Sequence, residues 1–154
     1  MSSTKIQKSD CVLCQEVGGR LLWENDLVRV INADDANYPA FTRVIYQSHI
    51  CEMSDLSPQQ RQELMDYVWL IEEVQREVLE PTKINLAQFG TMVPHVHWHI
   101  IPRFKNDPHY PDAIWSALPE QLDIDSLNKY LNNQKELLPQ YETRLVDRLK
   151  LMVK

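Results

Sequence analysis

The segment HVHWHII, residues 95–101, alternates histidine with apolar residues over its first six positions. Successive side chains of a β-strand point to opposite faces. A period of two therefore places His95, His97 and His99 on one face and the apolar side chains on the other. The apolar face would anchor the strand in a core, and the other face would display three imidazoles rigidly. The segment predicts a half-buried strand that carries a preorganised polar site.

The flanking sequence predicts the elements around this strand. A helix is expected at 58–80, because Ser57 is a good N-cap, Pro58 suits the first helical position, Gln60 completes a capping box and Pro81 ends the helix. Residue type and periodicity predict the other elements: strands at 21–24, 27–32, 41–47, 83–89 and 95–101, and C-terminal helices at about 124–138 and 140–152, separated by Pro139. This order predicts an α+β fold, with an antiparallel five-stranded sheet, a long helix and extra C-terminal helices packed on one side.

Composition narrows the classes of function. The 154 residues suit one globular unit, and a net charge of -6 argues against binding of a nucleic acid polymer. Three glycines are too few for a Gly-rich phosphate loop, and no apolar run reaches the ~20 residues that a membrane span needs. Residues 1–10 are polar, resemble no signal peptide and are expected to form a mobile tail. Three cysteines, an odd number, indicate a reducing compartment, so a cytoplasmic location is expected.

The three histidines allow three interpretations from the residues alone. They form a polar strand face without further function, a metal site, or a nucleophilic site in which one imidazole attacks and its neighbours hold its tautomer. Clustering three groups with pKa values near 6.5 is unfavourable without a purpose, which disfavours the first.

The same segment resembles the signature of the histidine triad (HIT) family, His-φ-His-φ-His-φ-φ with φ apolar. Upstream, Asn85 and Gly90 match an Asn and a Gly of the family, and 39–49 resembles a family strand that ends in His49. The CxxC of Cys11 and Cys14 is similar to that of bacterial members. The resemblance predicts a HIT domain at 11–105 and a C-terminal extension at 106–154 packed on the same unit.

The resemblance implies a nucleotide-binding hydrolase or transferase that acts at the α-phosphate of nucleoside phosphoramidates or dinucleoside polyphosphates. His97, the middle histidine, would attack phosphorus and become transiently nucleotidylated, with His99 and His95 completing the catalytic set. No organic cofactor is implied, and the small nucleotide substrate and a second copy of the chain, as a symmetric homodimer, are the expected partners.

Nucleotide contacts are predicted upstream of the triad and after the second strand. Asn32 and Asp34 stand where family members bind the ribose hydroxyls, although ordinary turn capping explains these residue types equally well. The full predicted nucleotide-binding set is Asn32, Asp34, Asn85, Gly90, Thr91 and Val93.

A structural zinc is implied by relatives in which a CxxC, a histidine after the third strand and the first triad histidine bind the metal. The ligands here would be Cys11, Cys14, His49 and His95, a closed Cys₂His₂ set without an open position. The alternative is a pair of reduced surface cysteines.

Three departures from the family pattern bear on the leaving group. Thr91 stands where an amide side chain is usual, Met92 where a small polar residue often lies, and Phe41 where a fourth, supporting histidine often lies. Thr91 keeps open a non-catalytic nucleotide-binding module, and a zinc metallohydrolase that uses the three strand histidines is the other rival.

Four further residues receive predictions of their own. Arg103 is expected to pair with phosphate or with a carboxylate of a second subunit, Cys51 to fill the core and His109 to lie at the surface. Trp115 is expected either to cover a base or to pack on a neighbouring chain.

Overall fold

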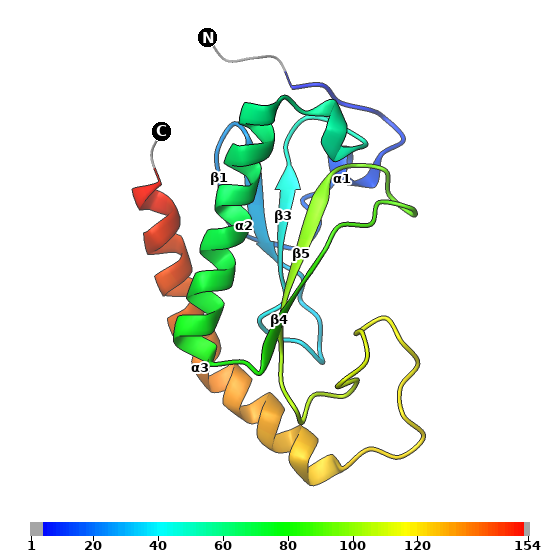
Figure 1. Cartoon of the computed structure of the whole chain (residues 1–154), viewed down its shortest axis with the longest axis vertical. Coiled ribbons are helices and arrows are strands. Elements are labelled where there is room, and N and C mark those ends of the chain that lie inside the picture. Colours follow the sequence, from blue (N-terminus) through cyan, green and yellow to red (C-terminus); the bar gives the residue numbers. More distant parts are fainter. Residues whose placement is uncertain (1–4, 153–154) are drawn as a thin grey trace.

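A computed structural model describes residues 5–152, which form one antiparallel sheet covered by helices (Figure 1). The strand order is β1-β2-β3-β5-β4. The strands are β1 (Arg20–Glu24), β2 (Val28–Asn32), β3 (Thr42–Tyr46), β4 (Lys83–Ala87) and β5 (His97–Arg103). The helices are α1 (Val12–Gln15), the 3-10 turn η1 (Met53–Asp55), α2 (Pro58–Leu79) and α3 (Ile124–Leu151). The predicted α+β class and five antiparallel strands are confirmed.

The long helix α2 begins and ends where the sequence predicts. The Ser57 hydroxyl accepts the backbone N–H of Gln60, and the Gln60 side chain accepts the backbone N–H of Ser57, which closes the capping box. Glu80 then adopts a left-handed conformation with φ of 48° and stops the helix before Pro81. Capping of this kind contributes about 1 kcal/mol and fixes where the helix enters the fold.

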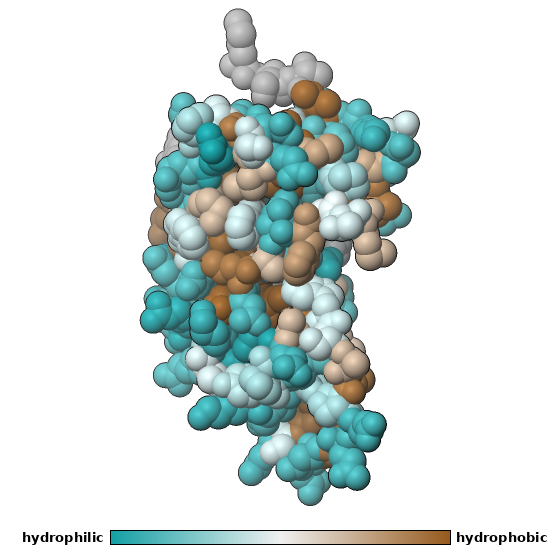
Figure 2. Space-filling view, turned by 45° about the vertical axis from the view of Figure 1, so that its right-hand side comes forward, coloured by the Kyte–Doolittle hydropathy of each residue, from teal (hydrophilic) through white to brown (hydrophobic). Residues whose placement is uncertain are grey.

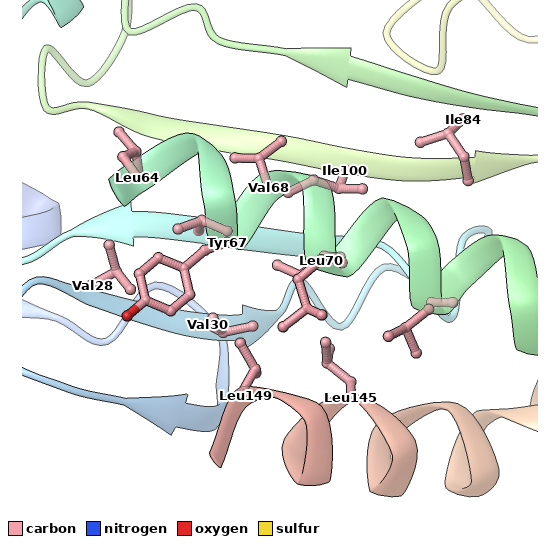
Figure 3. Packing of buried hydrophobic residues seen from close by; sticks show 14 of the residues in the cluster. Val28, Val30, Leu64, Tyr67, Val68, Leu70, Ile84, Ile100, Leu145 and Leu149 are labelled. Atoms are coloured by element: carbon pink, nitrogen blue, oxygen red, sulfur yellow. The ribbon is translucent and has the colours of Figure 1, made fainter. Parts of the chain in front are cut away.

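The two faces of the sheet have different chemistry. Val28, Val30 and Ile100 point into the main core, where they meet α2 and α3 (Figure 3). Val44 belongs to the same core cluster. The opposite face carries Arg29, Arg43 and the histidines of β5, and pairing of Arg43 with His99 across the β3–β5 ladder places these two side by side. Truncating one buried leucine of this core costs about 2–5 kcal/mol, so the core holds the strand beneath the histidines in place.

The C-terminal region differs from the expectation of two helices. A single helix α3 runs through Pro139, and Tyr141, Leu145 and Leu149 beyond the proline are fully buried. The Tyr141 hydroxyl lies 2.6 Å from that of Thr42 and accepts a hydrogen bond from Gln75. Packing of this half of the helix therefore outweighs the backbone hydrogen bond that proline removes, a cost of roughly 3 kcal/mol.

The remaining strand boundaries lie within two residues of those predicted. β4 ends at Ala87 instead of 89, and β5 runs over 97–103 instead of 95–101. Residues 1–4 of the predicted tail lie outside the described residues, whereas Ile6 hydrogen-bonds with Ser48 and His49 near the end of β3. Within residues 5–152, no helix is both long enough and apolar enough to cross a membrane. The face of the molecule in Figure 2 is largely hydrophilic, with small groups of hydrophobic residues.

Candidate functional site

His97 is held with one ring nitrogen fixed and the other free to react. Its Nδ1 lies 2.6 Å from the backbone carbonyl oxygen of His95. A carbonyl only accepts, so Nδ1 carries the proton and Nε2 keeps its lone pair. Burial lowers the pKa of His97, as does the charge of Arg43, against the opposing effect of the bond to the His95 carbonyl. The ring is therefore neutral at pH 7, as a nucleophile requires.

His99 lies beside His97 with its proton on the opposite nitrogen. Its ring centroid is 5.0 Å from that of His97, and Arg43 Nε donates to His99 Nδ1 at 3.2 Å. Nδ1 is thus an acceptor, and the proton of the neutral ring lies on Nε2. Burial, with the charges of His97 and Arg43, lowers the pKa of His99 to about 3, so the ring is neutral at any physiological pH.

Aromatic side chains surround His99. Phe41 packs edge-on at 5.5 Å between ring centroids, and Trp115 does so at 5.2 Å. Phe89 contacts both His99 and Trp115 and is 59% exposed, and Trp115 is 50% exposed. Trp115 therefore covers the histidine face of its own chain with half of its surface in solvent, where an aromatic or heterocyclic group can stack.

His95 faces a different set of groups. Its Nδ1 lies 3.4 Å from Cys11 Sγ and 3.6 Å from Cys14 Sγ, and its Nε2 lies 2.6 Å from the carbonyl oxygen of Tyr46. Since the carbonyl accepts, the proton sits on Nε2 and the Nδ1 lone pair points at the two sulfur atoms. Both nitrogens are engaged, so His95 cannot join His97 and His99 around one ion.

Cys11, Cys14, His49 and His95 could hold a metal ion, since their ligand atoms all lie within 4.8 Å of one another. Cys14 Sγ is also 3.4 Å from His49 Nδ1. Tetrahedral zinc with Zn–S near 2.3 Å and Zn–N near 2.05 Å separates sulfur from nitrogen by about 3.6 Å. The three sulfur–nitrogen distances match this edge, so these donors are spaced as a zinc ion requires.

Arg29 holds the segment that carries the cysteines, a role that the sequence did not reveal. Its buried guanidinium donates to the backbone oxygens of Leu13, Glu16 and Val17, at 2.6, 3.0 and 2.9 Å. These bonds tie the turn after Cys14 to β2, which places the thiols next to His95. A lone arginine in a strand gives no sequence signal of such a role.

The predicted ribose contacts, Asn32 and Asp34, already have hydrogen-bond or ion-pair partners within the chain. Asn32 is buried, donates to the Pro39 carbonyl and accepts the backbone N–H of Asp34. Asp34 has a positive φ of 53° and pairs with Arg20 at 3.3 Å. Asn32 is therefore a turn-capping residue here, whereas the exposed Asp34 remains reachable by solvent.

The other predicted nucleotide contacts lie in and after β4. Asn85 accepts a hydrogen bond from Arg103 at 2.8 Å. Gly90, with a left-handed φ of 83°, and the exposed Thr91 lie in the loop that leads into the triad. Val93, half-buried, packs beside the apolar cluster around Cys11.

Arg103 and His109 lie in a buried network, although His109 was expected at the surface. Arg103 Nε pairs with Asp107 at 2.8 Å, and the Tyr38 hydroxyl lies 2.6 Å from His109 Nδ1. The pairing partner of Arg103 is thus a carboxylate of its own chain. Burial alone would raise the pKa of Asp107, but hydrogen bonds from Arg103 and from backbone N–H groups lower it. The expectation of a buried Cys51 is also wrong, because its thiol is exposed.

Comparison with known proteins agrees with this geometry. The HIT domain family matches residues 15–106. A bis(5'-nucleosyl)-tetraphosphatase (asymmetrical) of Schizosaccharomyces pombe is 33% identical over 85 residues, which are 52% of this chain and 47% of that protein. The chain thus spans about half the length of this curated relative.

Solved structures share the fold. A histidine triad protein from Marinobacter aquaeolei VT8 has a TM-score of 0.61 and 27% identity, over 81% of this chain and 92% of that one. A Zn-bound histidine triad family protein from Mycobacterium smegmatis has a TM-score of 0.57 and 21% identity, over 90% of this chain and 97% of that one. With the family match spanning more than half of its residues, the chain belongs to the HIT domain family.

Proposed function

We propose that this protein is a nucleotide hydrolase or transferase that acts at the α-phosphate through a nucleotidyl-histidine intermediate on His97. The observation that carries the proposal is the hydrogen bond from His97 Nδ1 to the His95 carbonyl, which leaves Nε2 unprotonated. A neutral imidazole fixed in this tautomer is a competent nucleophile at pH 7.

The reaction has two displacements. His97 Nε2 attacks the α-phosphorus and forms a P–N bond, while the bond to the leaving group breaks and its electron pair departs with that group. A departing amine takes up a proton, and a departing polyphosphate leaves as an anion. Water then attacks phosphorus, the bond to Nε2 breaks, and the nucleoside monophosphate is released with the proton of water passing to solvent.

The substrate class is a nucleoside phosphoramidate or a dinucleoside polyphosphate. The Schizosaccharomyces pombe relative is named for cleavage of a dinucleoside tetraphosphate, which supports the second member of this pair. Asp34, Asn85, Gly90, Thr91 and Val93 remain the proposed nucleotide contacts. Asn32, whose amide already hydrogen-bonds within the loop, would contribute to nucleotide binding by holding the loop that carries Asp34 in shape.

We further propose that Cys11, Cys14, His49 and His95 hold a structural zinc. The sulfur–nitrogen distances support this, and the Mycobacterium smegmatis relative is described as Zn-bound. When bound, the metal supplies a closed, structural cross-link and no site for substrate. It would hold His95 and its backbone carbonyl in place. Because that carbonyl accepts the hydrogen bond from His97 Nδ1, the metal would also help to fix the tautomer of His97.

The two rival functions fit the geometry less well. A metallohydrolase that uses all three strand histidines requires His95, whose two nitrogens already face the cysteines and the Tyr46 carbonyl. A non-catalytic nucleotide-binding module would not need a free Nε2 on His97, but the Thr91 substitution is compatible with it.

The proposal also includes a symmetric homodimer, for which light scattering should give twice the mass of the chain.

A substrate panel tests the proposed function. Adenosine and guanosine phosphoramidates, an adenylylated amine and dinucleoside polyphosphates are incubated with the protein, and release of the monophosphate is followed by chromatography. We expect turnover of at least one class, with a nucleotidylated protein detectable by intact mass after an acid-free quench. Monophosphate binding without turnover of any member would favour the non-catalytic module instead.

A further inference from the structure

Arg43 is a half-buried cation next to the triad that the mechanism above does not use. It stands opposite His99 in the β3–β5 ladder, so both side chains lie on the same face of the sheet. Its Nε donates to His99 Nδ1 at 3.2 Å, and its Nη1 donates to the Gly18 carbonyl at 3.4 Å. The guanidinium also lies over the Phe41 ring, 4.9 Å from its centroid.

The charge of Arg43 is not neutralised by an ion pair. Among the arginines of the sheet, Arg20 and Arg103 pair with carboxylates, and the buried Arg29 is satisfied by three backbone carbonyl oxygens. Among residues 5–152, Arg43 forms no such pair, and Asp35 acts on it only from a distance. Arginine stays charged even when partly buried. A half-buried cation whose hydrogen-bond partners are all neutral favours an anion at the same place.

Arg43 also decides which nitrogen of His99 faces the site. A guanidinium only donates, so it holds His99 Nδ1 as an acceptor and leaves the proton on Nε2. Phe41, which directly precedes β3 and also contacts His99, has no hydrogen-bonding atom and cannot perform this task. Without Arg43, the neutral ring would distribute its proton between its two nitrogens.

We infer that Arg43 makes the histidine face a phosphate site, by holding His99 as an Nε2–H donor and by placing a fixed positive charge beside it. This inference rests on the proposed function and assigns Arg43 as a positioning residue that acts through His99. The anion is the α-phosphate of the nucleotide, whose non-bridging oxygens meet the His99 N–H while His97 attacks phosphorus. A donor and a charge set in place before the substrate arrives stabilise the transition state without reorganisation.

Four variants separate the two contributions of Arg43. Arg43→Gln keeps an N–H donor for His99 and removes the charge, Arg43→Lys keeps the charge and removes the planar Nε, and Arg43→Leu removes both. Arg61→Leu, at an exposed position of α2, is the control for the loss of one positive charge. Circular dichroism establishes that each variant is folded. If Arg43→Leu does not fold, the Gln and Lys variants carry the test.

Two measurements read the variants. Long-range ¹⁵N–¹H NMR of the histidine rings reports the tautomer of His99, which we expect as Nε2–H in wild type and Arg43→Gln, and as a mixture in Arg43→Leu. Calorimetry compares AMP with adenosine and GMP with guanosine. We expect Arg43→Leu to reduce the preference for monophosphate over nucleoside about tenfold, Arg43→Gln to reduce it as well, and Arg61→Leu to leave it unchanged.

The outcomes distinguish this inference from the proposed function. If the wild-type protein turns over nucleotides and Arg43→Leu retains both the Nε2–H tautomer and the monophosphate preference within twofold, the inference is wrong and the proposed function stands. If the wild-type protein neither turns over a substrate nor prefers the monophosphate, the proposed function and the phosphate site are both wrong. A lost tautomer together with a lost phosphate preference establishes Arg43 in the role assigned to it.

Discussion

His95 and His97 are the same residue type and lie only two positions apart, just before and at the start of β5, yet their environments assign them to different chemistry. His95 is fully buried, with one nitrogen on the Tyr46 carbonyl and the other directed at two thiols. His97 is half-buried, with one nitrogen on the His95 carbonyl and the other free. The first arrangement suits a structural metal ligand, and the second suits a nucleophile.

The difference shows that backbone carbonyls, more than the imidazoles themselves, set the chemistry of this strand. Each carbonyl accepts one N–H and thereby directs the other nitrogen of the ring, toward sulfur for His95 and toward the open face for His97. The two sites are also linked, because the His95 carbonyl that fixes His97 belongs to the residue that the cysteines hold. The predictions below test whether the two histidines are as separate in function as they are in environment.

The largest effect is expected for His97→Asn. The amide occupies a similar volume but cannot form the nucleotidyl intermediate, so turnover should fall by at least about 10³-fold while monophosphate affinity stays within about tenfold. Steady-state kinetics and calorimetry measure the two quantities. Turnover that survives in this variant, or a nucleotide trapped on any other residue, would overturn the assignment of His97.

The second prediction concerns His95 and the other proposed zinc ligands. The purified protein should carry close to one zinc per chain, and Cys14→Ser should lose it, because metal binding contributes to folding free energy. A loss of several kcal/mol lowers Tm by about 10 °C or more for a chain of this size. Elemental analysis measures the zinc content, and calorimetric melting measures Tm.

Cys51→Ser is the matched control for the loss of a thiol. Cys51 lies outside the cluster of four ligands and is exposed. Its Sγ contacts only the far nitrogen of His49, Nε2, at 3.6 Å, and serine keeps a polar group there. Metal content should therefore be unchanged, and Tm should shift by at most about 2 °C. Protein prepared without chelator that contains no metal would contradict the structural zinc, and the distances among the four side chains would then need another explanation.

Much of this arrangement could be predicted from short-range sequence patterns. The period of two in HVHWHII placed the histidines and the core residues on opposite faces, and the capping box fixed the start of α2. The candidate metal cluster also followed, although from the family resemblance and not from spacing. These features depend on residues whose neighbours in space are either near in sequence or named by a motif.

The features that escaped prediction depend on partners distant in the sequence. His109 is buried because its ring forms a hydrogen bond with the hydroxyl of Tyr38, which is 71 residues away in the sequence. Pro139 does not end a helix, because Tyr141 and the leucines after it pack against elements that precede them by 60 residues or more. Arg43 escaped because its partner His99 is 56 residues away, and a single arginine in a strand has no signature of its own.

The third prediction extends the comparison along the same strand to Arg103, the last residue of β5. Its partner Asp107 is buried, and the pKa of this carboxyl lies below the usual value, since hydrogen bonds to the ionised form outweigh burial. A carboxyl with a lowered folded pKa contributes stability above its unfolded pKa, near 3.9, and loses that contribution as the pH falls through the folded value.

Asp107→Asn should therefore destabilise the protein at pH 7 by about 3 kcal/mol or more, because it leaves Arg103 buried without its counter-charge. The difference in unfolding free energy between wild type and variant should shrink as the pH falls below about 4. Denaturant unfolding of both proteins at a series of pH values from about 2.5 to 7 measures this difference in unfolding free energy. A difference that is independent of pH would show that the carboxylate charge is not what stabilises the pair.

The smallest effect is expected at Thr91, on the loop that leads into the triad. Its hydroxyl is exposed and shorter in reach than the amide that is usual in the family, so one fixed donor for the leaving group is missing. A polyphosphate leaves as an anion and needs fixed donors more than an amine does, since an amine is neutralised by a proton. We therefore expect phosphoramidates to be cleaved faster than dinucleoside polyphosphates by the wild-type protein.

Thr91→Gln should raise polyphosphate cleavage by a few-fold more than phosphoramidate cleavage, because the longer amide reaches the developing charge on the leaving group. The control is Met92→Gln at the next position, which is 96% exposed and should change neither rate. Because the ratio of kcat/KM for the two substrate classes cancels changes in active protein, it isolates the leaving-group step. A wild-type protein that already cleaves polyphosphates faster would show that another donor serves the leaving group. The candidates are then the backbone N–H groups of the loop, since Arg103 is committed to Asp107 and Asn85.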